Sequence, residues 1–118
     1  MTAEQPAPAA AQLDPEDAKI ITLARSARAR NRAAEGAAVR DATGRTYAAV
    51  TISLPSLKLS ALEVAVAMAV SSGADRLEAA AIVSEAAELA DADFAAARDL
   101  NVGAVFLAAL DGSVVTRR

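Results

Sequence analysis

The sequence of 118 residues contains neither histidine nor cysteine. A zinc site built from imidazole or thiolate ligands is therefore impossible, because these are the side chains that protein zinc sites normally use. Serine–histidine and cysteine–histidine nucleophiles are excluded in the same way, as is any proton transfer by imidazole. Disulfide bonds cannot form either. The composition thus rules out several classes of enzyme before any motif is considered.

Aromatic residues, glycine and long apolar runs are also scarce. Aromatic side chains make up 3% of the residues, so the core has to be built from alanine, valine, leucine and isoleucine. The longest apolar run, residues 61–70, is interrupted at Glu63 and is too short to span a bilayer. Only five glycines occur, and none has the spacing of a phosphate-binding loop. The net charge of −3 provides no field that attracts nucleic acid or an anionic membrane.

The first twelve residues differ in composition from the rest of the chain. Residues 1–12 are rich in proline, alanine and glutamine and have no apolar periodicity, which predicts a disordered tail. They also lack the basic and apolar regions of a signal peptide. Residues 13–118 have the length of one domain, so we expect a single domain in a soluble, cytoplasmic protein. The abundance of alanine and of arginine over lysine is typical of a GC-rich bacterial genome.

Capping residues and short apolar runs predict helices that alternate with strands. Asp14 and Pro15 suit the start of a helix that continues to about residue 34 and is closed by Gly36. The other expected elements are strands at 37–40 and 45–53, a helix at 60–72, a strand at 77–83, a helix at 91–100, and strands at 103–110 and 113–116. This order predicts an α/β fold with a mixed sheet of about five strands and about three helices.

The helix expected at residues 60–72 is apolar on nearly every side. Such a helix is normally buried. We therefore expect it to be the most buried helix of the fold, with Leu62, Val66, Ala69 and Val70 in the core.

The order and lengths of these elements resemble the cytidine deaminase family over roughly residues 14–115. Residues 42–45 (Ala-Thr-Gly-Arg) resemble the family's Asp-Gly-Arg-type turn between two strands. Residues 60–65 and 69–73 resemble the family's Cys-Ala-Glu helix, which carries zinc-site residues. Later segments resemble the strands and the turn that follow this helix, at residues 80–84, 105–108 and 110–113. The resemblance implies α-β-α layers like those of a cytidine deaminase.

The residues that carry the family's chemistry are replaced at the matching positions. The resemblance places the zinc-binding cysteine at Ser60, the proton-shuttling glutamate at Leu62, the two cysteines of the second zinc motif at Phe94 and Ala97, and the ribose-binding pair at Thr51 and Ser53. Deamination requires a metal-activated hydroxide and a carboxylate that moves protons. We therefore expect a protein that uses no zinc or other cofactor and has no catalytic residues.

The acidic stretch at Glu85, Glu88, Asp91 and Asp93 offers oxygen ligands that could hold a divalent cation. It has no EF-hand spacing. We interpret it as a solvated loop in which Asp91 or Asp93 caps the following helix.

Three arginines form the most distinctive charged feature of the first helix. Arg25, Arg28 and Arg32 follow helical spacing about a quarter turn from the apolar stripe, so we expect them to be exposed. Arginine binds carboxylate and phosphate groups in a bidentate way, which makes this face a candidate contact for an acidic protein or for RNA. The alternative is a solubilising helix face. The lack of stacking aromatic residues nearby disfavours recognition of single-stranded nucleic acid.

Three functions are compatible with these observations. The favoured one is a non-catalytic protein on a cytidine deaminase-like scaffold that acts by protein–protein interaction or self-assembly, as a dimer or tetramer. The second is an enzyme of the deaminase or nucleoside-hydrolysing type with an unrecognised site. The third is an RNA-associated accessory protein that uses the arginine face. None of the three involves a membrane, and the sequence does not name a partner.

Overall fold

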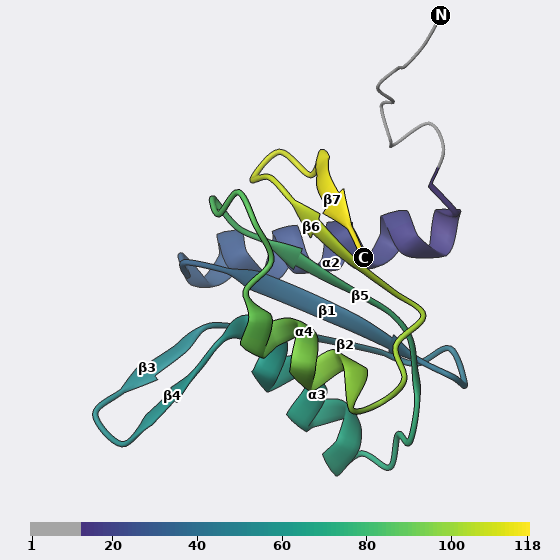
Figure 1. Ribbon diagram of the computed structural model, residues 1–118. Coiled ribbons are helices and arrows are strands. Elements are labelled where there is room, and N and C mark those ends of the chain that lie inside the picture. Colours follow the sequence, from purple (N-terminus) through teal and green to yellow (C-terminus); the bar gives the residue numbers. More distant parts are fainter. Residues whose placement is uncertain (1–12) are drawn as a thin grey trace, which may run out of the picture.

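The computed structural model describes residues 13–118, in which three helices pack on a mixed five-stranded sheet (Figure 1). The helices are α2 (Pro15–Asn31), α3 (Ala61–Ser71) and α4 (Asp91–Arg98). The strands are β1 (Gly36–Asp41), β2 (Thr46–Val50), β3 (Ile52–Leu54), β4 (Leu57–Leu59), β5 (Leu77–Val83), β6 (Ala104–Ala108) and β7 (Val114–Arg117). The α/β class predicted from the sequence is confirmed. The tail predicted at residues 1–12 lies outside the described residues.

The main sheet has the strand order β2-β1-β5-β6-β7. β1 runs antiparallel to both β2 and β5, and β6 runs antiparallel to β7. β5 and β6 are parallel, and α4 lies in the crossover connection that such a pair needs. The bounds of β5 are those predicted from the sequence. Its residues are almost all buried, as expected for a strand covered by helices on both faces.

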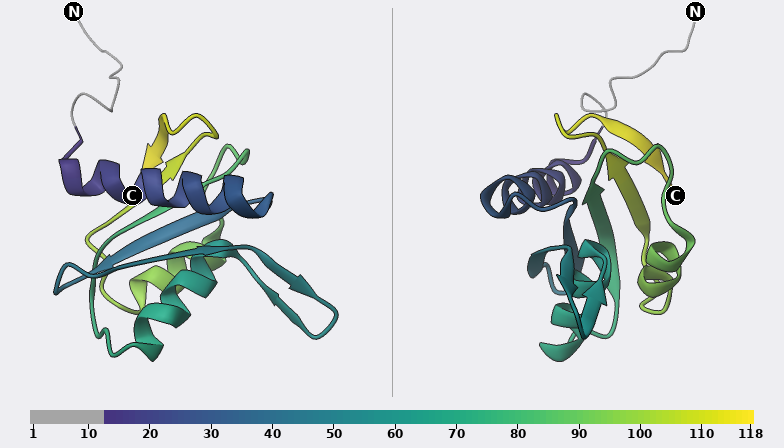
Figure 2. Two further views of the ribbon diagram at one scale, coloured as in Figure 1. Left: turned by 180° about the vertical axis from the view of Figure 1, so that it is seen from behind. Right: turned by 90° about the vertical axis from the view of Figure 1, so that its left-hand side faces the viewer.

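Alternating side chains of the central strands form two cores, one on each face of the sheet. Ile20 and Ala24 of α2 pack in one core with Phe106 of β6. Leu62 of α3 packs in the other core with Leu107, the next residue of β6. The right-hand view of Figure 2 shows α2 and α4 on opposite sides of the sheet. None of the helices in residues 13–118 is long and apolar enough to cross a membrane.

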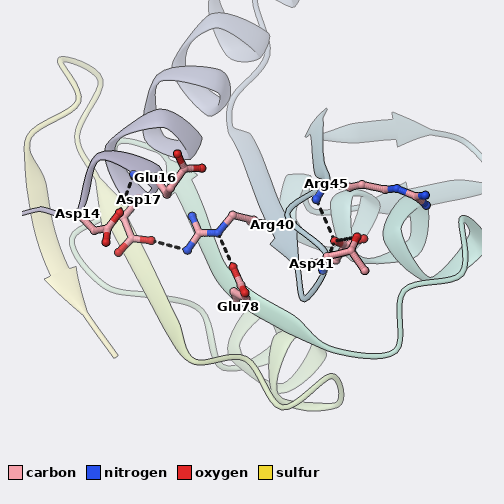
Figure 3. Close-up of polar contacts among 8 residues, drawn as sticks. Asp14, Glu16, Asp17, Arg40, Asp41, Arg45 and Glu78 are labelled. Atoms are coloured by element: carbon pink, nitrogen blue, oxygen red, sulfur yellow. Dashed lines mark hydrogen bonds and ion pairs between the residues drawn. The ribbon is translucent and has the colours of Figure 1, made fainter.

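The buried guanidinium group of Arg40 ties α2 to the sheet (Figure 3). From β1, its Nη2 donates to Asp17 Oδ1 of α2 at 3.0 Å and its Nε donates to Glu78 Oε1 of β5 at 2.8 Å. Burial opposes the charge of Arg40, but the hydrogen bonds to Glu78 and Asp17, together with the negative charges of these two residues, outweigh it and raise the pKa of the guanidinium group. The three side chains therefore link one helix to two neighbouring strands.

Helix α2 starts where the sequence predicts and ends earlier than predicted. Asp14 caps the start as predicted, since its Oδ1 accepts a hydrogen bond from the Glu16 amide at 2.8 Å. The helix ends at Asn31, before the predicted boundary near residue 34, because Arg32 adopts a left-handed φ of 52°. Gly36 begins β1 instead of closing the helix. A Cβ atom at Gly36 would lie 2.1 Å from the carbonyl oxygen of Ala24, so only glycine lets β1 approach α2 this closely.

Helix α3 is buried on one side only, which corrects the prediction for its outer residues. Leu62 and Ala69 are fully buried as predicted, whereas Val66 is half-buried and Val70 is 49% exposed. The helix packs on a single face of the sheet, and no other part of the described chain covers the opposite side. An apolar sequence was insufficient to predict burial here, because the fold has no further layer outside α3.

A second hairpin replaces the end of the long strand predicted at residues 45–53. β2 ends at Val50, and β3 and β4 then pair only with each other, with Pro55 in the turn between them. We call residues 52–59 the arm. Figures 1 and 2 show it projecting from the end of β2 beyond the rest of the chain. Leu54 and Leu57 near its tip are 55% and 49% exposed.

Candidate functional site

The start of α3 is the place where polar side chains from distant parts of the chain meet. Ser60 caps the helix, and its Oγ accepts a hydrogen bond from the Glu63 amide at 3.1 Å. In return, the Glu63 carboxylate accepts a hydrogen bond from the Ser60 amide at 2.9 Å. This reciprocal capping box satisfies two backbone donors at the helix end and fixes where the helix begins.

The Ser60 hydroxyl also connects α3 to α4. It donates a hydrogen bond to Oδ1 of Asp93, whose side chain is buried at 5% exposure. Burial raises the pKa of Asp93, the hydrogen bond from Ser60 acts against this rise, and the negative charge of Glu63 adds to it. The Ser60 hydroxyl thus accepts a hydrogen bond within α3 and donates one to α4, so the same residue caps one helix and ties it to the other.

Glu35 brings a third carboxylate to this region from the residue before β1. Burial and the charge of Asp93 raise the pKa of Glu35, while the Ser84 hydroxyl and the Ala61 amide lower it. The backbone of Glu35 is fixed by Thr51: the Glu35 amide donates to Thr51 Oγ1 at 3.1 Å, and the Thr51 amide donates to the Glu35 carbonyl at 3.3 Å. We call Glu35, Glu63 and Asp93 the acidic cluster.

This cluster is not evident from the sequence. Glu35 and Asp93 are far apart in the chain, and no spacing rule connects them to Glu63. Asp93 was assigned to a solvated loop as one of two capping residues for the last helix. That assignment is wrong, because Ala90 occupies the N-cap of α4 without a side-chain cap, and Asp93 is buried against Ser60.

The structure brings some of the family's motif positions together and separates others. Ser60 and Leu62 lie in the first turn of α3, which packs against the helix that carries Phe94 and Ala97. Leu62 and Ala97 are fully buried, and Phe94 is half-buried with the guanidinium carbon of Arg118 4.3 Å from its ring centroid.

Thr51 and Ser53, at the positions that the resemblance assigns to ribose binding, have different surroundings. Thr51 joins β2 to β3 and bonds to the backbone of Glu35. Ser53 lies on the arm and is exposed. The Thr51 hydroxyl is thus engaged by the protein's own backbone, whereas no hydrogen bond ties the Ser53 side chain to the described chain.

The side chains at these positions do not fit a zinc ion. The three ligand positions carry a hydroxyl, a phenyl ring and a methyl group, at Ser60, Phe94 and Ala97. Zinc in proteins is bound by thiolate, imidazole and carboxylate groups. Within residues 13–118, no three acidic side chains are arranged so that they could hold a metal ion. We therefore derive no reaction step from a zinc-bound hydroxide.

The three arginines of the predicted face lie in different surroundings: Arg25 and Arg28 share a hollow, and Arg32 lies outside it. Nε of Arg25 donates to the Leu110 carbonyl at 3.0 Å, and Nε of Arg28 donates to the Ala34 carbonyl at 3.4 Å. Both residues line one hollow beside α2. Arg32 is the exposed C-cap of the helix and is not part of that hollow.

Comparison with known proteins agrees with this architecture. The structure is similar to the crystal structure of cytidine deaminase from Burkholderia pseudomallei, with a TM-score of 0.72 and 22% sequence identity over 85% of this chain and 89% of that one. This similarity defines the class of fold. The family model described as cytidine deaminase-like matches residues 13–112, so the chain belongs to the cytidine deaminase-like family. No curated protein matches the sequence.

Proposed function

We propose that this protein is a non-catalytic member of the family and acts by self-association, as a dimer or tetramer, in the bacterial cytoplasm. Residues 13–118 form the single functional domain in this proposal. The observation that carries it is the concentration of exposed apolar side chains on the arm and on the adjoining helix α3. The partner is a second copy of the chain, which buries these side chains.

The arm has the properties of a segment that needs a partner. An isolated two-stranded hairpin is marginally stable in water. The arm makes no strand pairing outside itself in the described chain, and Leu54 and Leu57 remain about half exposed near its tip. Strand edges that are not covered also favour pairing with another chain. Contact with a second copy would stabilise the arm and cover both leucines.

The outer side of α3 supplies a second apolar surface directly after the arm in sequence. Met68 and Val70 are 41% and 49% exposed on this helix. Four of the five large hydrophobic residues that are exposed in residues 13–118 lie on the arm or α3; the fifth is Val115. Exposed apolar side chains gathered on neighbouring elements of this kind commonly mark an interface.

The composition of the acidic cluster supports a non-catalytic role. The Ser60 hydroxyl is committed to Asp93 and to the Glu63 amide, and no imidazole or thiolate is present to activate it. Leu62 fills the position of the proton-shuttling glutamate in the resemblance, and it is fully buried. The cluster accordingly serves to position helices in this proposal.

The oligomeric state of arm variants tests this function. Light scattering of the wild type should show dimers or tetramers at about 100 µM, well above a micromolar dissociation constant. Leu54→Ser combined with Leu57→Ser should shift the mass toward the monomer. Val115→Ser is the matched control, because Val115 is equally exposed but lies on β7.

Two outcomes would contradict the proposal. One is a wild type that remains monomeric at this concentration. The other is an assembly that is unchanged by the arm substitutions or is disrupted equally by Val115→Ser.

A further inference from the structure

Helix α2, the end of β5 and the turn after β6 border an open hollow that is lined by two arginines. Its volume is about 230 Å³. It is lined by Thr22, Arg25, Ser26, Arg28, Ala29, Val83 and Leu110. None of these residues is acidic, so the hollow combines positive charge with two hydroxyl groups.

The side chain of Arg25 is held in place by the turn that follows β6. Its Nε donates to the Leu110 carbonyl at 3.0 Å. Its aliphatic part passes over Gly112, where an added Cβ atom would lie 3.1 Å from Arg25 Cδ. The guanidinium group is therefore positioned by contacts with two residues of the turn.

Arg28 is positioned by the segment that connects α2 to β1. Its Nε donates to the Ala34 carbonyl at 3.4 Å, and its side chain is half-buried. A carbonyl acceptor uses only one of the five N–H donors of a guanidinium group. Arg25 and Arg28 therefore each keep their terminal N–H groups for another acceptor.

Neither of these two charges is neutralised by an ion pair in the described chain. The ion pairs within residues 13–118 are those of Arg40 with Asp17 and Glu78. Asp111 is an acidic residue close to Arg25. Its pKa is lowered mainly by hydrogen bonds from Ser113, and the charge of Arg25 contributes to the same shift. The Asp111 carboxylate accepts hydrogen bonds from Ser113 and does not line the hollow.

We propose that this hollow binds a phosphate group. Planar guanidinium groups match the geometry of phosphate and form strong charge-assisted hydrogen bonds with it. Thr22 and Ser26 add hydroxyl donors on the same wall. Because contacts to backbone carbonyls already order both arginines, binding costs less conformational entropy than it would with free side chains. The hollow is open to solvent and small, which suits one anionic group, and Arg32, which a longer acidic partner would also contact, lies outside it.

Titration of inorganic phosphate into the full chain, followed by calorimetry at low ionic strength, tests the site. The wild type should bind one phosphate per chain. Arg28→Gln keeps the Cβ atom that faces Gly36 and should weaken binding about tenfold, because it removes a charged donor. Arg30→Gln removes an exposed arginine of the same helix outside the hollow and should leave the affinity close to that of the wild type.

A second variant and a second ligand complete the test. Ser26 is exposed, so Ser26→Glu should retain the fold while placing a carboxylate at the wall of the hollow, and it should abolish phosphate binding. A nucleoside monophosphate that binds with the same dependence on Arg28 would assign the site to phosphate carried on an organic group. Binding of inorganic phosphate alone would assign it to the free anion. The proposal is overturned if neither ligand saturates the protein below about 10 mM, or if Arg30→Gln weakens binding as much as Arg28→Gln.

Discussion

The hydroxyl of Ser60 donates a hydrogen bond to the carboxylate of Asp93 and thereby joins the first turns of α3 and α4. The family resemblance places one zinc ligand at Ser60 and another at Phe94, the residue after Asp93. In this chain, a bond between two side chains links the helices where the resemblance would put the family's metal ion. The pairing explains how the region stays ordered although its residues do not fit zinc.

Replacing Asp93 should change how stability depends on pH. Because burial raises the pKa of Asp93, the folded protein binds this proton more tightly than the unfolded chain does. Asp93 therefore contributes stability at low pH that is lost as the pH rises from about 3.8 toward the raised pKa. Asp93→Asn cannot titrate, so the melting temperature of the variant minus that of the wild type should become more positive through this range.

Asp91→Asn is the control for Asp93→Asn, since it removes an exposed acid from the same turn of α4. It should not reproduce the pH-dependent difference. A difference for Asp93→Asn that stays constant with pH would show that burial does not raise the pKa of this carboxyl group in the folded protein.

Restoring the family's carboxylate at Leu62 should damage the fold without creating activity. Leu62 is fully buried, and burying an unpaired carboxylate costs several kcal/mol or forces it to remain protonated. Leu62→Glu should therefore lower the free energy of unfolding in urea by about 2 kcal/mol or more. In protein dilute enough to be monomeric, Val70→Glu on the exposed side of the same helix should change it by no more than about 0.5 kcal/mol. Equal effects of the two substitutions would contradict the orientation of α3.

The purified protein should contain no stoichiometric zinc and should release no ammonia from cytidine or deoxycytidine. The reason is the donor set: the chain has no histidine or cysteine, and the motif positions carry Ser60, Phe94 and Ala97. Elemental analysis by mass spectrometry and an ammonia assay check the two statements separately. One tightly bound zinc per chain, or turnover above a buffer blank, would refute the proposed non-catalytic function.

A pair of glycine substitutions should isolate the contact between Arg25 and the turn after β6. Gly112 and Gly44 have φ values of +90° and +91°, so alanine at either position should cost about 1 kcal/mol or more in backbone strain. A Cβ atom at Gly112 would also press on Arg25 Cδ, whereas nothing lies within 4 Å of one at Gly44. Gly112→Ala should therefore be the more destabilising in urea unfolding.

The Arg25→Ala background provides the control for this glycine pair. Removing the Arg25 side chain should bring the cost of Gly112→Ala close to that of Gly44→Ala, because only backbone strain then remains. If Gly112→Ala costs the same with and without Arg25, the side chain does not rest on the turn.

Features that depend on neighbouring residues in the chain could be predicted from the sequence. Asp14 as the N-cap of α2 and the bounds of β5 follow from local preferences and from a short apolar run, and both agree with the structure. The helix at Ser60 was also located correctly to within one residue at each end. These features require no knowledge of what lies across the fold.

Features that depend on distant parts of the chain were missed. The exposure of Val70 follows from the absence of a further layer outside α3, and the need for Gly36 follows from the position of Ala24 in another element. The meeting of Glu35 with Asp93 requires both β1 and α4 to begin near the start of α3. Sequence spacing contains no information about these distances, so the acidic cluster could only be found in the structure.

The position of β5 between β1 and β6 also orders the events of folding. The β1–β2 and β6–β7 hairpins join residues that are close in sequence, and such pairs form rapidly. β5 pairs with β1 and β6 over much longer chain separations, which carry the larger loop-closure entropy. We therefore expect the two hairpins to form before β5 docks between them. Substitutions in Ala79–Ala81 that weaken this docking should slow refolding as well as destabilise the native state, since β5 pairs with both β1 and β6.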